Sequence, residues 1–99
     1  MQKNNPDSSA PDSKTRPRLR QGVRLKPAAP GVDQTLLFPE GFADLDEPSA
    51  AVLNLCDGKR TVDEIVENLA GQFDAPRDQI AADVFEYLRS LRDMALIEW

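Results

Sequence analysis

Two pairs of carboxylates are the residues in this chain whose types and spacing best suit chemistry. Asp44 and Asp46 lie two positions apart, and Asp63 and Glu64 are adjacent. Paired carboxylates can act as general acid and general base. However, Asp63 and Glu64 follow Thr61 in the first turn of a helical pattern, where the helix macrodipole favours acidic residues. Asp44 and Asp46 fall on one side of an extended segment, where a solvated face explains them. Neither pair therefore indicates catalysis.

Other reactive groups are scarce. The chain of 99 residues has no histidine and a single cysteine, Cys56. This composition excludes a Cys/His metal site, an intramolecular disulfide and a histidine general base. The glycines stand singly, so they form no phosphate-binding loop. Cys56 is expected to be a small buried apolar side chain. The sequence thus predicts a binding protein that is not an enzyme and uses no metal or cofactor.

Charge is distributed unevenly along the chain. Residues 1–32 carry seven basic and two acidic residues, a net charge of +5. Residues 33–99 carry five basic and fifteen acidic residues, a net of −10, and the two parts together give the net −5 of the whole chain. An acidic domain repels phosphate backbones, so nucleic acid is not the expected partner. The basic N-terminal arm is either a solvated tail or a contact for an anionic partner.

No segment predicts a membrane or secretory protein. The chain has no run of the roughly 18 to 20 apolar residues that span a bilayer, and the apolar stretch of a secretory signal is missing from its start. A cytoplasmic protein is expected.

The pattern of prolines and apolar residues divides the chain into two parts. Residues 1–17 contain three prolines and no large apolar side chain other than Met1, which predicts a disordered leader. Residues 18–99 are predicted to form one domain. Its first half has three β-prone runs, at residues 19–26, 35–38 and 42–46. The last two are joined by the turn Pro39-Glu40-Gly41, which indicates a hairpin.

The second half of the domain is helical. A first helix is expected from Pro48, capped by Asp46 or Glu47, to the turn Asp57-Gly58. A capping box of Thr61 and Glu64 opens the second helix, a third is predicted from Pro76 to about Met94, and the last residues, 96–99, are expected to be extended. The predicted fold is α+β and winged-helix-like, with a short N-terminal antiparallel β-sheet followed by a three-helix bundle.

Winged-helix order leaves more than one function open. In a DNA-binding regulator the third helix would read the groove, but its exposed charges are nearly balanced, which disfavours that role. A scaffold subunit that pairs its sheet with a second copy is another alternative.

A peptide site is predicted between the third strand and the third helix. If residues 42–46 form an edge strand, their backbone groups can accept an added strand. At about 100° per residue, the apolar arc of the third helix covers about half its circumference, and Phe85 lies at its margin beside Arg89 and Arg92. Phe85 either caps the core or borders a groove.

Several motifs carry a family resemblance over roughly residues 19–99. They are Leu37-Phe38-Pro39-Glu40-Gly41, Leu45, the run from Leu53-Asn54-Leu55-Cys56 through Asp57-Gly58-Lys59-Arg60-Thr61-Val62 to Ile65, and Asp83-Val84 through Leu96-Ile97. In these the chain resembles PqqD, the pyrroloquinoline quinone biosynthesis protein D family. The resemblance implies a winged-helix-like recognition element that binds the leader part of the precursor peptide PqqA and presents it to the radical S-adenosylmethionine enzyme PqqE. It also implies that the peptide is held as an added strand between the third strand and the third helix.

The residue pattern and the resemblance together define a predicted peptide site. On the strand, the expected contacts are the backbone groups of Phe42, Ala43, Asp44, Leu45 and Asp46. On the third helix, the predicted wall consists of Phe85, Leu88, Arg89 and Arg92, and the opposite margin near Asp83 and Tyr87 is the lesser candidate. A homodimer that forms through the same sheet edge is compatible with this site.

Overall fold

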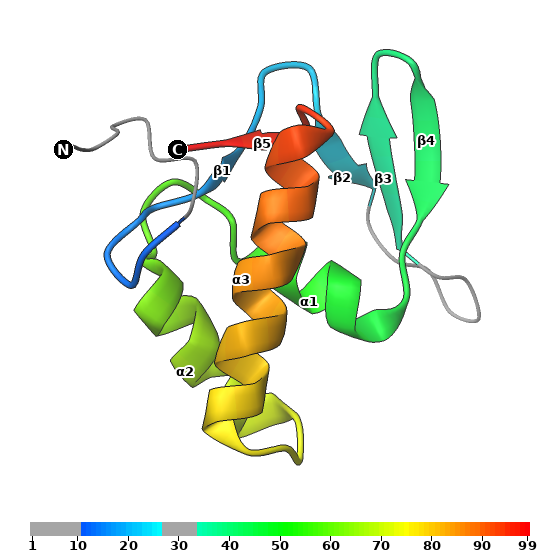
Figure 1. The fold of residues 1–99 in the computed structure, drawn as a ribbon. Helices are drawn as coiled ribbons and strands as arrows, with labels where there is room; N and C mark the ends of the chain where they lie inside the picture. The colour runs from blue at the N-terminus through cyan, green and yellow to red at the C-terminus, as the bar shows by residue number, and fades with distance from the viewer. Residues whose placement is uncertain (1–10, 27–33) are drawn as a thin grey trace, which may run out of the picture.

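The computed structural model describes residues 11–26 and 34–99, and within them it has two small antiparallel sheets and three helices (Figure 1). In chain order the elements are β1 (Arg18–Leu19), β2 (Arg24–Lys26), β3 (Thr35–Phe38), β4 (Gly41–Asp44), α1 (Glu47–Asn54), α2 (Val62–Gln72), α3 (Arg77–Asp93) and β5 (Ile97–Glu98). The predicted α+β class, with strands before a three-helix bundle, is confirmed. The extended C-terminal segment is also present, as β5.

The predicted strand over residues 19–26 is in fact two strands in different sheets. β1 pairs with β5, whereas β2 pairs with β3. Gly22 lies between them with a φ of 90°, a left-handed conformation that glycine adopts without steric penalty. Leu19, Val23 and Leu25 fall on one face of an alternating pattern on both sides of Gly22, which is why the sequence predicts one strand.

β3 and β4 form the expected hairpin. β3 has the predicted bounds, and Phe38 pairs with Gly41 across the Pro39-Glu40 turn. β4 ends at Asp44, two residues before the predicted end. The reason is that Asp46 is the N-cap of α1, where its Oδ1 accepts the Ser49 N–H at 2.9 Å.

The helices follow their local signals. In the capping box of α2, the Glu64 N–H donates to Thr61 Oγ1 at 3.2 Å and the Thr61 N–H donates to Glu64 Oε1 at 2.8 Å. α1 is shorter than predicted, because the N–H groups of Leu55 and Cys56 bond to carbonyls three residues back, at 3.0 and 3.1 Å. This tightening is typical of a helix end. α3 spans nearly the predicted range.

The core lies between the three helices and the inner face of the sheet β2-β3-β4. Its largest fully buried apolar side chains are Leu36, Leu53, Ile65, Leu88, Leu91 and Ile97. Among the described residues no polar or charged residue is buried. Cys56 is buried in this core as predicted, and burial raises the pKa of its thiol to about 12.

Residues 11–17, which we call the N-terminal strap, were expected to belong to a disordered leader, but the structure packs them against the domain. The carbonyls of Ser13 and Thr15 accept the N–H groups of Asp63 and Val62, at 3.0 and 2.8 Å. These N–H groups belong to the first turn of α2, and the N–H groups of a first turn have no acceptors within their own helix. The backbone groups of a polar segment thus cap a distant helix, an interaction that composition does not reveal. Residues 1–10 lie outside the described residues, so the leader itself stays a prediction.

Candidate functional site

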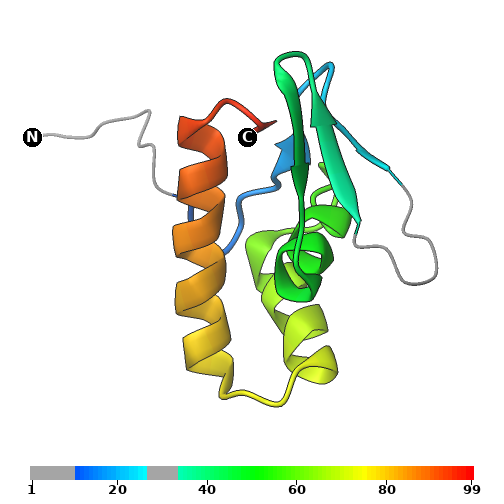
Figure 2. The same cartoon turned by 90° about the vertical axis from the view of Figure 1, so that its right-hand side faces the viewer.

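β4 is an edge strand among the described residues. It pairs with β3 on one side, and none of the described strands pairs with its other side. Figure 2 looks onto β4, with α1 directly below it and α3 on the left of the view. The unpaired side of β4 is therefore the place where a further strand can bond to this sheet.

The hydrogen bonds to β3 determine which residues of β4 face outward. The Leu45 N–H donates to the Gln34 carbonyl at 2.8 Å. In an antiparallel ladder, bonded and non-bonded pairs alternate, so Ala43, which pairs with Leu36, also directs its N–H and C=O toward β3. Phe42 and Asp44 then direct theirs toward the free edge. Of the five predicted strand residues, these two present free backbone groups.

Side chains on the outer face of the sheet leave an aromatic ring exposed. Phe42 is 67% exposed and pairs with Leu37, and Asp44 Oδ1 accepts a hydrogen bond from the Thr35 hydroxyl at 3.1 Å. Ala43 and Leu45 point to the inner face, where Leu45 is buried. The predicted strand residues thus divide into an outward pair, an inward pair and Asp46, which caps α1.

A cavity of about 290 Å³ opens where the chain passes from β4 into α1. Side chains from α1, the end of α2 and α3 surround it, and its floor is part of the core. The lining residues are Pro48, Ser49, Val52, Leu69, Phe73, Ala75, Ile80, Asp83, Val84 and Tyr87. A second hollow, of about 360 Å³, lies at the other end of α3, where Met94 approaches Pro39 and Glu40 of the hairpin turn. Of the two hollows, only the second includes residues of the hairpin turn.

Tyr87 joins α3 to the start of α1. Burial raises the pKa of its phenol, a hydrogen bond with Ser49 opposes that change, and the nearby negative charge of Asp46 adds to it. Tyr87 therefore lies across the cavity from the residues that follow β4. Tyr87 and Asp83 are the α3 residues at the rim of this cavity.

The four predicted residues of α3 do not face this cavity. Leu88 is fully buried in the core. The guanidinium of Arg92 lies 4.6 Å from the ring centre of Trp99, next to β5. At about 100° per residue, Phe85, Arg89 and Arg92 lie about 140–160° around the helix from Tyr87. Asp83 and Tyr87, the lesser candidate of the sequence analysis, are the α3 residues that line the cavity beside the start of α1.

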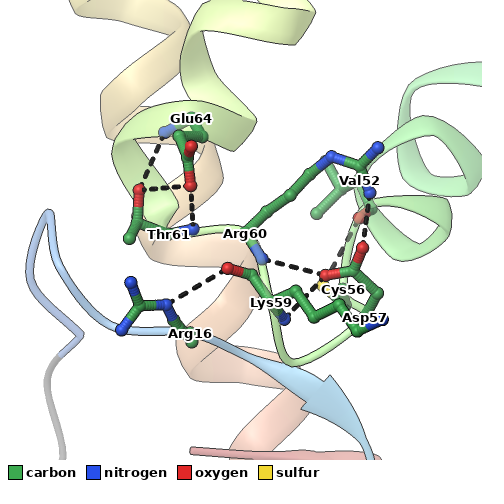
Figure 3. Close-up of polar contacts among 8 residues, drawn as sticks. All are labelled: Arg16, Val52, Cys56, Asp57, Lys59, Arg60, Thr61 and Glu64. Atoms are coloured by element: carbon green, nitrogen blue, oxygen red, sulfur yellow. Dashed lines mark hydrogen bonds and ion pairs between the residues drawn. The ribbon is translucent and has the colours of Figure 1, made fainter.

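The turn Asp57-Gly58-Lys59-Arg60, one of the motifs that carry the family resemblance, lies next to the N-terminal strap (Figure 3). Asp57 Oδ1 accepts the N–H groups of Lys59 and Arg60 at 2.8 and 2.9 Å, and its Oδ2 lies 2.5 Å from Arg60 Nη1. These bonds lower the pKa of Asp57, and the bond from the Arg60 N–H has the largest effect. Arg16 of the strap donates from Nε to the Lys59 carbonyl at 3.1 Å. The motif therefore stabilises the connection between α1 and α2.

No group of three or more His, Cys, Asp or Glu side chains among the described residues could hold a metal ion. None of the helices described is long and apolar enough to cross a membrane.

Known proteins resemble this chain in sequence and in fold. A "PqqA binding protein" from Xanthomonas axonopodis pv. citri is 39% identical over 83 residues, which cover 84% of this chain and 90% of that protein. The solution structure of the PqqD part of Methylobacterium extorquens PqqCD, described as a functional stand-alone RiPP recognition element, is 36% identical with a TM-score of 0.76 and covers 92% of this chain and 97% of that one. TbiB1 in complex with the TbiA(β) leader peptide superposes with a TM-score of 0.71 at 20% identity, over 82% of this chain and 94% of that one, a likeness of fold.

The family profile gives the most direct assignment. The profile described as coenzyme PQQ synthesis protein D matches residues 34–97. This range holds β3, β4, all three helices and the start of β5, and so includes the free strand edge and the cavity. The chain belongs to the PqqD family.

Proposed function

We propose that this chain binds the precursor peptide PqqA as a strand added to the outer edge of β4. The observation that carries the proposal is the unpaired edge of β4, which none of the described strands covers. Relatives named as PqqA binding proteins support the identity of the peptide. The geometry described above supports the mode of binding, because an edge strand gives main-chain hydrogen bonds and neighbouring pockets give specificity.

In the proposed complex the peptide bonds to the backbone of Phe42 and Asp44. Ala43 and Leu45 hold β4 to β3, and Asp46 fixes the start of α1. The opposite wall of the groove is the Asp83 and Tyr87 margin of α3, in place of the predicted wall of Phe85, Leu88, Arg89 and Arg92.

A proline scan of β4 tests the strand addition. Phe42→Pro removes an outward N–H without removing a bond to β3, and Phe42→Ala removes the same side chain but keeps the N–H. One hydrogen bond corresponds to roughly two- to tenfold in affinity. Phe42→Pro is therefore expected to bind synthetic PqqA more weakly than Phe42→Ala by about that factor in calorimetric titration. Equal affinities of the two variants, both folded by circular dichroism, would contradict strand addition.

We further propose that the chain is a peptide chaperone without catalytic activity, which presents PqqA to PqqE in the cytoplasm. A peptide strand that pairs with the outer edge of β4 uses one of its own edges, so the second edge of the peptide stays accessible to an enzyme. In a reconstituted reaction, PqqE is expected to modify PqqA faster with the unaltered chain than with Phe42→Pro. Equal rates with both chains would contradict presentation through β4.

The same edge favours a second role in self-association. An exposed edge strand with an exposed aromatic side chain, Phe42, can pair with a second copy of itself. We propose that a homodimer formed through β4 competes with the peptide. Sedimentation velocity is expected to show association that increases with concentration and is reversed by PqqA. A dimer that persists with saturating peptide would place the dimer interface elsewhere.

A further inference from the structure

The cavity between α1 and α3 combines an apolar floor with an acidic rim. Val52, Ile80 and Val84 form part of the floor and are buried, whereas Asp83 at the rim is exposed. We propose that this cavity receives one apolar side chain of the bound peptide, and that Asp83 selects peptides with a lysine or arginine two positions from that side chain. This inference rests on the strand addition proposed above.

The size and lining of the cavity fit one side chain. Its volume of about 290 Å³ is at the lower limit of the roughly 300–1,000 Å³ of small-molecule sites. The walls expose core side chains to solvent, and an apolar group that covers them removes this surface from water on both sides. A peptide strand along β4 reaches the cavity because Pro48 and Ser49, which line it, come four and five positions after Asp44.

The charges around the cavity favour a basic residue on the same face of the peptide. None of the residues that line the cavity is basic, and Asp83 lines it from α3. Asp44 and Asp46, at the end of β4, add two further carboxylates on the approach to α1. Side chains at positions i and i+2 of a strand point to the same face. A cationic side chain two positions from the apolar anchor therefore lies on the face that Asp83 borders.

Two pairs of variants separate the apolar and the charged contact. Ala75→Phe places a large side chain at the cavity rim, and Ala82→Phe places the same side chain at an exposed position of α3 that does not line the cavity. Asp83→Asn removes the rim charge, and Glu86→Gln removes an exposed charge that does not line the cavity. Each chain is titrated with synthetic PqqA and with a full alanine scan of that peptide, at low and high salt.

The expected result is a specific coupling between chain and peptide. Alanine at one apolar peptide position should weaken binding to the unaltered chain at least about tenfold, and much less to Ala75→Phe. Alanine in place of a lysine or arginine two positions from this apolar residue should weaken binding to the unaltered chain about threefold at low salt. The same peptide change should cause no further loss of affinity for Asp83→Asn. The control variants should behave like the unaltered chain.

Different outcomes separate this inference from the proposed function. If the unaltered chain binds PqqA, Phe42→Pro weakens binding, and no peptide residue couples to Asp83 or to position 75, strand addition stands and the cavity inference is wrong. An apolar anchor that couples to Ala75→Phe, without any basic residue that couples to Asp83, overturns the selection by charge. No binding of PqqA by the unaltered chain contradicts both.

Discussion

Removal of the N-terminal strap is expected to destabilise the domain and leave peptide affinity unchanged. The comparison uses a chain that lacks residues 1–16 and a chain that lacks residues 1–10, so only residues 11–16 differ. In the longer chain, the carbonyls of Ser13 and Thr15 accept the first two N–H groups of α2, at 3.0 and 2.8 Å. The shorter chain loses both acceptors.

The magnitude follows from these contacts. A net contribution of about 1 kcal/mol for each hydrogen bond gives about 2 kcal/mol for the two. In a domain of this size 1 kcal/mol shifts Tm by about 4–8 °C, so the two truncated chains should differ by about 8–16 °C. Burial of Pro11 adds to this difference. Thermal unfolding followed by circular dichroism measures Tm, and urea unfolding gives the free energy.

A matched point variant tests the same contact in the full chain. Asp12 orders the strap, since its Oδ1 accepts the Lys14 N–H at 2.8 Å and its own N–H donates to Thr15 Oγ1 at 2.9 Å. Asp12→Ala should therefore lower Tm by less than the truncation. Truncated chains with Tm values within about 2 °C of each other, which corresponds to less than about 0.5 kcal/mol, would refute the capping role.

Peptide binding provides the second readout of this experiment. The strap bonds to the first turn of α2 and to the turn before it, and none of the hydrogen bonds described for it reaches β4. The two truncated chains should bind PqqA with equal affinity at a temperature where both are folded. A weaker affinity of the shorter chain would place part of the peptide site on the strap.

Three further outcomes are expected. Gly58→Ala should lower the free energy of unfolding by about 1–2 kcal/mol, because Gly58 has a φ of 78° and an added Cβ would lie 3.2 Å from a neighbouring side chain. An added Cβ at Gly71 in α2 meets open space, so Gly71→Ala should stabilise the domain by about 0.5–1 kcal/mol. Urea unfolding compares the two variants. The hydrogen bonds that Asp46 accepts hold its pKa below the usual 3.8, so its stabilisation is present above that value and is lost as pH falls through the lowered pKa, and Asp46→Asn should show a weaker loss of stability between neutral and acidic pH. Cys56, whose thiol has its pKa raised to about 12 by burial, should react with a disulfide reagent at pH 8 only as fast as the domain opens, and rapid labelling of the folded chain would contradict its burial.

The parts of the fold that the sequence predicts correctly are those with local determinants. The capping box of Thr61 and Glu64 marks the start of α2, and Pro76 marks that of α3. The turn Pro39-Glu40 lies between two β-prone runs, which is enough to predict the β3–β4 hairpin. Errors arise where a local pattern has two solutions, as at Gly22, where Leu19, Val23 and Leu25 on one face of an alternating pattern hide the change from one sheet to the other.

The predicted site shows the same division. Residues 42–44 are correctly placed on a strand, because this follows from their own pattern and from the hairpin turn. The pattern alone does not say which of them face outward. That depends on the register with β3, which the bond from the Leu45 N–H to the Gln34 carbonyl establishes.

The sequence by itself determined the three helices, the β3–β4 hairpin, the buried stripe of α3 and the family to which the chain is similar. Only the tertiary structure decided which margin of that stripe lines the cavity beside α1. Tyr87 and Phe85 lie on opposite margins of the same core stripe. Helical spacing alone does not distinguish these two margins. The packing of α1 against Tyr87, which joins residues far apart in the chain, distinguishes them, and Arg92 lies against Trp99 on the other margin. The contact between the strap and α2 also depends on the tertiary structure, because a backbone carbonyl of any residue can cap a helix start that the fold brings near it.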